Sequence, residues 1–211
     1  MRKILCLVMI LSIGLIPPSL SLAAESNCPS WDDLPPNHLF YRYIQPLSCR
    51  GAIVGDDHLF HPNDPATRSV VARILVIGLG VPIYSATEPR FNDVSNRNPN
   101  FEYIETAARQ GWLHGYTDGK FKPELAISRL ELAMVLSRIL DQDSSTNGPQ
   151  FNDLSATTFG YAEVNRLSGW GIVSGEYCGQ GLCYRPHASV KRGELCKMVY
   201  QTITIYEQLA H

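Results

Sequence analysis

The chain has 211 residues, with 18 Lys and Arg against 20 Asp and Glu, so its formal net charge at pH 7 is −2. This balance argues against a nucleic-acid partner held by a basic face, and no block of like charge stands out. The length is enough for one domain of moderate size with its own core.

The first residues have the pattern of a secretory signal peptide. Arg2 and Lys3 supply positive charge, residues 4–16 are almost unbroken in their apolar character, and Ser21 and Ala23 fit a small-x-small cleavage site. The apolar run is shorter than the roughly 20 residues that span a bilayer. We therefore predict that residues 1–23 are a signal peptide and that the protein is secreted without a lipid anchor.

The remaining chain contains three copies of one pattern, and such repeats constrain the fold strongly. Each copy opens with an aromatic residue, and these three lie 60 residues apart. Further on come a G-x-x-x-G pair, an aromatic-x-Pro and then an arginine. In the order of the chain the copies contain Trp31, Gly51, Gly55, Phe60 and Arg68; Phe91, Gly111, Gly115, Phe121 and Arg129; and Phe151, Gly171, Gly175, Tyr184 and Arg192.

The middle copy predicts two amphipathic helices joined by a glycine-rich loop. Apolar residues at helical spacing in 101–108 indicate the first helix, and the loop covers 111–119. The second helix begins at Ser128, which forms a capping box with Glu131 three residues later. Its apolar stripe comprises Leu132, Val135, Leu136 and Ile139.

The opening F-x-D-V, the G-x-x-x-G-Y-x-D-G loop, the F-x-P and the arginine tetrad of the middle copy resemble the S-layer homology domain of bacterial cell-envelope proteins. The resemblance predicts repeats at 28–79, 91–140 and 151–205, with connectors at 80–90 and 141–150. One repeat is too small to bury its own faces, so three should pack together. The resemblance implies a mainly α fold, with three helix-loop-helix repeats in a pseudo-threefold spindle. The copies differ at Val70, which replaces the usual acid of the tetrad, and at Lys191, which replaces its hydroxyl residue.

Five cysteines follow the signal peptide, an odd number for a secreted protein, so at least one is free or pairs between chains. Cys178 and Cys183 flank a loop insertion, which favours a disulfide staple over a zinc site, because too few further ligands lie nearby. Cys28 precedes the first opening turn and Cys49 ends the following helix, which predicts a second disulfide. Cys196 takes the place of Ala133 and is predicted to be reduced and buried.

The three arginines are the candidate binding residues. Each is placed in the first turn of a helix, where a guanidinium and free backbone N–H groups would face the same volume and favour an anion. In the alternative interpretation each arginine pairs with Asp33, Asp93 or Asp153 of the opening turn and pins the repeat. The two roles could coexist.

The family resemblance favours binding, because it implies a groove for secondary cell-wall polysaccharide that carries acidic pyruvate ketals, which suit a bidentate arginine. Arg129 is expected to be the strongest site, Arg192 the second and Arg68 the last, and Arg129→Ala is expected to weaken binding without unfolding the protein. The predicted site residues are Arg129, Arg192, Arg68, Ser128, Glu131, Lys191, Glu194, Asp93, Asp153, Asp33, Gly115, Gly175 and Tyr116.

No G-x-S-x-G, H-E-x-x-H or Walker motif is present, so nothing in the sequence indicates an enzyme or a cofactor. His58 and His61 form an H-x-x-H pair that is more typical of polar surface than of a metal site. We expect non-covalent attachment to the cell envelope, with cell-wall polysaccharide as partner and possible association with surface-layer or envelope proteins. The alternatives are a secreted structural or protein-interaction module that has lost glycan binding, favoured by Val70 and by the absence of a cargo domain, and a hydrolase acting on wall glycan.

Overall fold

The computed structural model describes residues 28–141, 148–179 and 181–209. The predicted signal peptide and most of the connector at 141–150 lie outside them. The described part is mainly helical, as predicted, and none of its helices is long and apolar enough to cross a membrane. Its elements are α1 (Tyr41–Cys49), α2 (Arg68–Gly78), α3 (Phe101–Arg109), α4 (Arg129–Leu140), α5 (Tyr161–Gly169), β1 (Glu176–Tyr177), β2 (Leu182–Cys183) and α6 (Arg192–Leu209).

Local sequence signals explain where α4 begins and which face it buries. The Ser128 hydroxyl accepts from the Glu131 backbone N–H, and the Glu131 carboxylate accepts from the Ser128 N–H, so the predicted capping box is confirmed. The residues of the predicted apolar stripe are all buried. The capping box therefore determines where α4 starts, and the helical periodicity of its apolar residues determines which face it buries.

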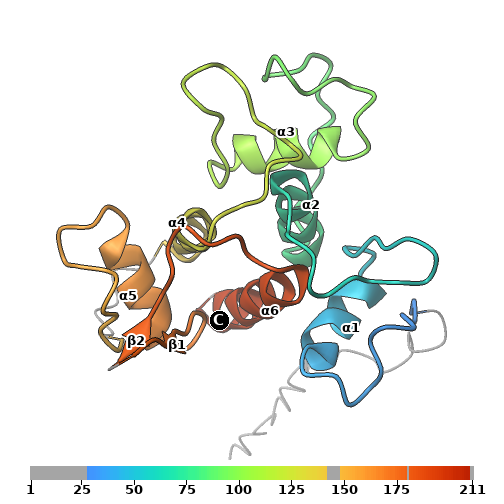
Figure 1. The fold of residues 1–211 in the computed structure, drawn as a ribbon. Helices are drawn as coiled ribbons and strands as arrows, with labels where there is room; N and C mark the ends of the chain where they lie inside the picture. Colours follow the sequence, from blue (N-terminus) through green and yellow to red (C-terminus); the bar gives the residue numbers. More distant parts are fainter. Residues whose placement is uncertain (1–27, 142–147, 180, 210–211) are drawn as a thin grey trace, which may run out of the picture.

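Helices from different sequence copies pack together in pairs. α2 packs on α3, α4 packs on α5, and α6 packs on α1, so each pair combines the second helix of one sequence copy with the first helix of the next. In Figure 1 the members α2, α4 and α6 lie innermost, and α1, α3 and α5 lie outside them. We call each of these helix pairs a lobe. Because α6 packs on α1, the last copy supplies one helix of the lobe that contains the first helix of the chain.

A closed ring of backbone hydrogen bonds joins the three segments that lead into the inner helices. The Ala66 N–H donates to the Val190 carbonyl (2.8 Å), the Ile127 N–H to the Ala66 carbonyl (2.9 Å), and the Val190 N–H to the Ile127 carbonyl (3.0 Å). All three side chains are fully buried. Each segment therefore depends on the other two for its backbone hydrogen bonds, since a buried N–H must find a partner.

The two glycines of each G-x-x-x-G pair are needed for different structural reasons. Gly111 follows α3 with φ at +73°, a left-handed conformation that glycine adopts without steric cost. At Gly115 a side chain would meet the ring of Phe91, because an added Cβ would lie 2.6 Å from that ring. The first glycine turns the chain, and the second lets the loop lie against the opening aromatic.

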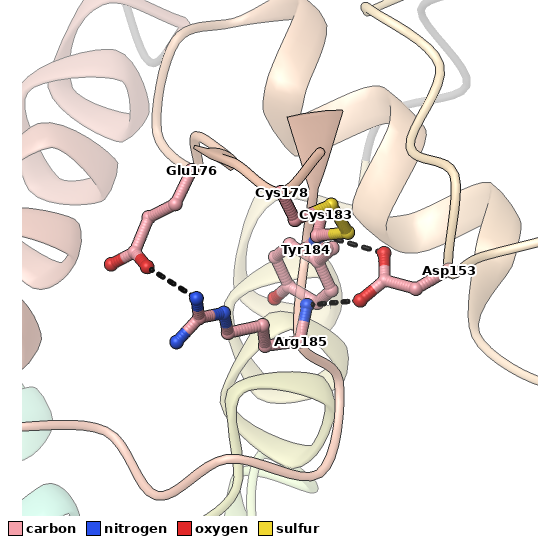
Figure 2. The surroundings of a disulfide bond; sticks show 6 residues. All are labelled: Asp153, Glu176, Cys178, Cys183, Tyr184 and Arg185. Carbon is pink, nitrogen blue, oxygen red and sulfur yellow. Dashed lines mark hydrogen bonds and ion pairs between the residues drawn. A yellow bond between two sulfur atoms is a disulfide. The ribbon is translucent and has the colours of Figure 1, made fainter. Parts of the chain in front are cut away.

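Both predicted disulfides are present, and the cysteine left over is buried. Cys28 pairs with Cys49, and Cys178 pairs with Cys183 across the ends of the β1–β2 hairpin (Figure 2). Cys196 is unpaired and fully buried, and this burial raises the pKa of its thiol to about 12. The Cys196 thiol is therefore protonated and unreactive in the folded protein.

This arrangement predicts a single reactive thiol in the denatured mature protein. A chain that begins after residue 23, unfolded without a reducing agent and treated with iodoacetamide, should gain one carbamidomethyl group, on Cys196. Peptide mass spectrometry locates it. Three or more modified cysteines would contradict the pairing.

Candidate functional site

The three arginines reach across to the next copy of the repeat. The Arg68 guanidinium donates from Nε to the Phe121 carbonyl (2.8 Å) and from Nη2 to the His114 carbonyl (2.6 Å). It also lies over the Phe121 ring, with 4.6 Å from its central carbon to the ring centroid. Only 4% of Arg68 is exposed, and this burial lowers the pKa of its guanidinium. Arg68 therefore joins α2 to the loop of the middle copy.

The other two arginines repeat this geometry. Arg129 donates to the carbonyls of Tyr184 and Ser174, both at 2.7 Å, and lies over the Tyr184 ring. Arg192 donates to the carbonyls of Phe60 (2.9 Å) and Val54 (2.7 Å), and lies over the Phe60 ring. Nε and Nη2 of each arginine are thus used to hold a loop, and Nη1 of Arg68 and Arg129 lies near a glutamate.

The expected free backbone N–H groups at the helix starts are not found. The Arg68 and Ser69 N–H groups donate to the carbonyls of Leu125 and Pro123 in the loop of the next copy. The Arg129 and Leu130 N–H groups do the same with Ala188 and Pro186. A ligand in this region would therefore meet side chains and not a helix N-terminus.

The opening aspartates hold the loops and do not pair with the arginines. The two Asp93 carboxylate oxygens accept from the backbone N–H groups of Phe121 and Lys122, each at 2.7 Å. Asp33 and Asp153 do the same for their own copies, and Figure 2 shows Asp153 with the N–H groups of Tyr184 and Arg185. Among the described residues, none of these aspartates forms an ion pair with an arginine, so the expected pairing is wrong. The arginines do hold the repeats together, but through loop carbonyls of the next copy.

A hollow of about 550 Å³ lies beside Arg68, and we call it the Arg68 groove. Its floor and walls come from α2, the loop after α3, and one face of α4, with Phe159 at the rim. The lining residues are Arg68, Leu113, His114, Gly115, Tyr116, Thr117, Glu131, Met134, Val135, Arg138 and Phe159.

Glu131 connects the capping box to this groove. One carboxylate oxygen closes the capping box with Ser128, and the other accepts from the Tyr116 hydroxyl (2.9 Å) and lies 4.0 Å from Arg68 Nη1. Although burial opposes ionisation, the bonds from Ser128 and Tyr116 outweigh it and lower the pKa of Glu131. Burial raises the pKa of Tyr116. At neutral pH the groove therefore contains an ionised acid and a neutral phenol.

A smaller hollow of about 140 Å³, the Arg129 groove, has a similar plan. Arg129 Nη1 lies 3.8 Å from a Glu194 oxygen, while the other Glu194 oxygen accepts from the Lys191 backbone N–H (3.0 Å). Leu39, Phe40, Ile172, Val173, Ser174, Lys197 and Met198 complete the lining. Gly175 lies next to this lining and packs under the Phe151 ring.

The structure therefore divides the residue set that the sequence assigned to Arg129. Glu131 and Tyr116 line the Arg68 groove, and Ser128 bonds to Glu131 behind it, whereas Arg129 faces Glu194. The reason is that each arginine contacts the loop and acid of the following copy. Arg192 makes no ion pair among the described residues, and Val70 stands at the tetrad position that Glu131 and Glu194 occupy in the other copies.

Two groove residues on α4 are not among the site residues predicted from the sequence. Met134 and Arg138 follow Glu131 at positions i+3 and i+7, so they lie on the same helix face and line the same groove. That spacing was readable in the sequence. His114 and Phe159 come from other segments, and only the packing of the lobes brings them to this groove.

The His58–His61 pair has no metal-binding neighbourhood. His61 Nε2 lies 2.7 Å from an Asp56 oxygen. Within the described ranges, no group of three or more His, Cys, Asp or Glu side chains could hold a metal ion.

Comparison with protein families agrees with this geometry. The family model described as "S-layer homology domain" matches residues 90–133. Residues 90–133 therefore match an S-layer homology domain. The matched segment runs from the residue before Phe91 into α4, so it includes the loop and the acid of the Arg68 groove.

Proteins with several different names share a similar stretch. An S-layer protein of Bacillus thuringiensis subsp. finitimus is 27% identical over 82% of this chain and 21% of its own length. An uncharacterised cell wall amidase of Bacillus anthracis is 26% identical over 89% of this chain and 34% of its own length. An endoglucanase of Bacillus sp. (strain KSM-635) is 26% identical over 64% of this chain and 14% of its own length. This chain thus spans about a fifth to a third of the first relatives it matches.

Proposed function

We propose that this protein is exported and attached non-covalently to the bacterial cell envelope, where its grooves bind secondary cell-wall polysaccharide with acidic pyruvate ketals. The observation that carries the proposal is the repeated groove: in two copies an arginine lies over an aromatic ring and faces a glutamate beside an open hollow. Planar guanidinium groups and aromatic walls suit a carboxylate-bearing sugar.

The variety of the relatives supports a binding role over a catalytic one. A surface-layer protein, an amidase and an endoglucanase share a stretch like this one, although their names denote different roles. We infer that the shared stretch serves attachment to the wall, since S-layer homology domains bind cell-wall polysaccharide in general. We therefore assign this chain no enzymatic activity and no cofactor.

The three sequence copies are proposed to be three S-layer homology repeats, at 28–79, 91–140 and 151–205, around a pseudo-threefold axis. The closed hydrogen-bond ring of Ala66, Ile127 and Val190 supports this arrangement, because each repeat contributes one equivalent donor and acceptor. The α6–α1 contact then makes one chain a complete module.

The Arg68 groove is proposed to bind most strongly, although the sequence placed Arg68 last of the three sites. It has the larger volume, and Tyr116 adds a second aromatic ring 4.8 Å from the Arg68 guanidinium carbon. The Arg129 groove comes second, and the Arg192 position comes last because Val70 stands at the position of the acid.

Retention on purified sacculi tests the proposal. The mature protein should sediment with intact sacculi and should stay in solution with sacculi whose wall polymer has been removed by mild acid. Equal sedimentation with both would contradict polysaccharide binding. The alternative, a surface-layer module without glycan binding, is favoured by Val70 and predicts no sedimentation with either. Release of sugar or peptide from the sacculi would indicate a hydrolase.

Phe159→Ala gives a prediction about the groove rim. Phe159 is 75% exposed, so its removal should not affect folding, yet it lines the Arg68 groove. Loss of one stacking surface is worth about 0.5–1.5 kcal/mol, or about two- to tenfold in affinity. Tyr177→Ala is the matched control, since Tyr177 is 84% exposed and outside the groove lining. Sedimentation at graded sacculus concentrations measures both, and equal behaviour of the two variants would contradict the assignment.

A further inference from the structure

The Arg68 groove has a basic side that the arginine tetrad does not explain. Arg138 comes from α4 and His114 from the loop after α3, and both line the groove. Arg138 is held in place by a bond from Nη1 to the Trp112 carbonyl (3.0 Å). Two separate elements therefore direct cationic or protonatable groups to the same hollow.

The charges in this groove are unequally matched. Glu131 lies at ion-pair distance from Arg68 and also accepts from Tyr116 and Ser128, so its lone pairs are largely occupied. Arg138 forms no ion pair with any residue in the described part of the chain. The groove thus has two permanent positive charges and one negative charge, before His114 is counted.

His114 responds to these neighbours. Partial burial first, and then the charges of Arg138 and Arg68, lower the pKa of His114. Of the other groups that face the groove, Glu131 has a lowered pKa and Tyr116 a raised one, so neither changes its protonation between about pH 5 and 8. Val135, Met134 and Phe159 complete the groove wall without charge. His114 is therefore the lining group whose protonation responds to a charge placed beside Arg138 and Arg68.

We infer that Arg138 and His114 form an anion subsite on the α4 side of the Arg68 groove, which holds an acidic substituent of the glycan and takes up a proton at His114 on binding. The inference rests on the proposed function. An anion close to His114 offsets the repulsion from Arg138 and Arg68, so it favours the imidazolium form.

The sign of the pH dependence follows from proton linkage. Bound anion raises the pKa of His114 above that in the free protein, so the complex binds more protons than its components. Affinity therefore increases as pH falls through the pKa of the complex, and it becomes constant below the pKa of the free protein. Each pH unit between these two values changes affinity by about tenfold.

Calorimetry on the mature protein tests the subsite with a purified wall-polymer fragment that carries its ketal, and with the same fragment after mild acid has removed it. Affinity for the intact fragment should rise from about pH 8 to about pH 5. His114→Asn should abolish this rise. Arg138→Gln should weaken binding about ten- to a hundredfold at every pH, since it removes a charge-assisted bond. Arg185→Gln is the matched control, because Arg185 is an exposed arginine paired with Glu176 outside the groove.

The outcomes separate this inference from the proposed function. If the wild-type protein does not sediment with sacculi, the proposed function fails and the subsite fails with it. If it sediments but its affinity for the fragment is independent of pH, or if His114→Asn keeps the wild-type slope, only the subsite is overturned. Equal affinity for the intact and ketal-free fragments would also overturn it. Melting curves confirm that the exposed substitutions leave the fold intact.

Discussion

Arg68→Ala is expected to lower the free energy of unfolding by about 3 kcal/mol or more, and to lower the melting temperature by about 6–12 °C. The guanidinium is almost fully buried and donates to two loop carbonyls, which would lose their partners together. Hydrogen bonds from a charged donor contribute about 1.5–3 kcal/mol each. The middle loop should also lose order, and binding in the Arg68 groove should be lost with it.

Arg73→Ala is the matched control for this effect. Arg73 lies on the same helix, donates to the carbonyls of Ala52 and Gly51, and lies over the Tyr103 ring, but it is less buried than Arg68. Its loss should cost less than half as much, because water replaces the lost bonds. Arg68→Lys should recover only part of the stability, because an ammonium group cannot reproduce the two-pronged geometry. Thermal melts followed by circular dichroism measure all three, and equal shifts for Arg68→Ala and Arg73→Ala would show that burial is not the cause.

The same contacts revise the expectation for Arg129→Ala. The sequence suggested a binding defect without a folding defect, because Arg129 was placed only at a helix start. In the structure Arg129 donates to the carbonyls of Ser174 and Tyr184 in the next copy. Its substitution should therefore lower both the melting temperature and the affinity, and the exposed residues Phe159 and Arg138 are better probes of binding alone.

Structural features formed by residues of the same copy, close to one another in the sequence, were predictable from the sequence. The capping box of Ser128 and Glu131 involves residues three apart, and both disulfides join cysteines within one copy. Pairing between copies was not predictable in this way. The repeat spacing shows that Arg68, Arg129 and Arg192 are equivalent, but it does not show whether each contacts its own loop or the next one.

The choice between these two pairings depends on the packing of helices across copies. α2 packs on α3 and α6 on α1, so an arginine at the start of an inner helix lies beside the following loop. The residue set of each groove follows from that packing, and the proposed order of the sites depends on it. The acid that faces Arg68 is Glu131, although the sequence places Glu131 with Arg129.

Asp93→Ala is expected to lower the free energy of unfolding by about 3 kcal/mol, again about 6–12 °C in melting temperature. Its carboxylate accepts from two consecutive backbone N–H groups, and one of them belongs to the fully buried Phe121. The carboxylate also holds Lys122 at φ +57°, a left-handed conformation that costs a non-glycine residue about 1–2 kcal/mol. Without Asp93, the N–H of Phe121 loses its partner and Lys122 is free to relax.

Asp118→Ala controls for the loss of an acid from the same copy, because Asp118 is exposed and its contacts are with Lys122 and the Lys120 N–H. It should leave the melting temperature nearly unchanged. The double variant Asp93→Ala/Arg68→Ala should lose less stability than the two single variants added together, since Asp93 holds the N–H of Phe121 and Arg68 holds its carbonyl. Additive losses would mean that the aspartate and the arginine stabilise the loop independently, and that the groove does not depend on their joint hold on Phe121.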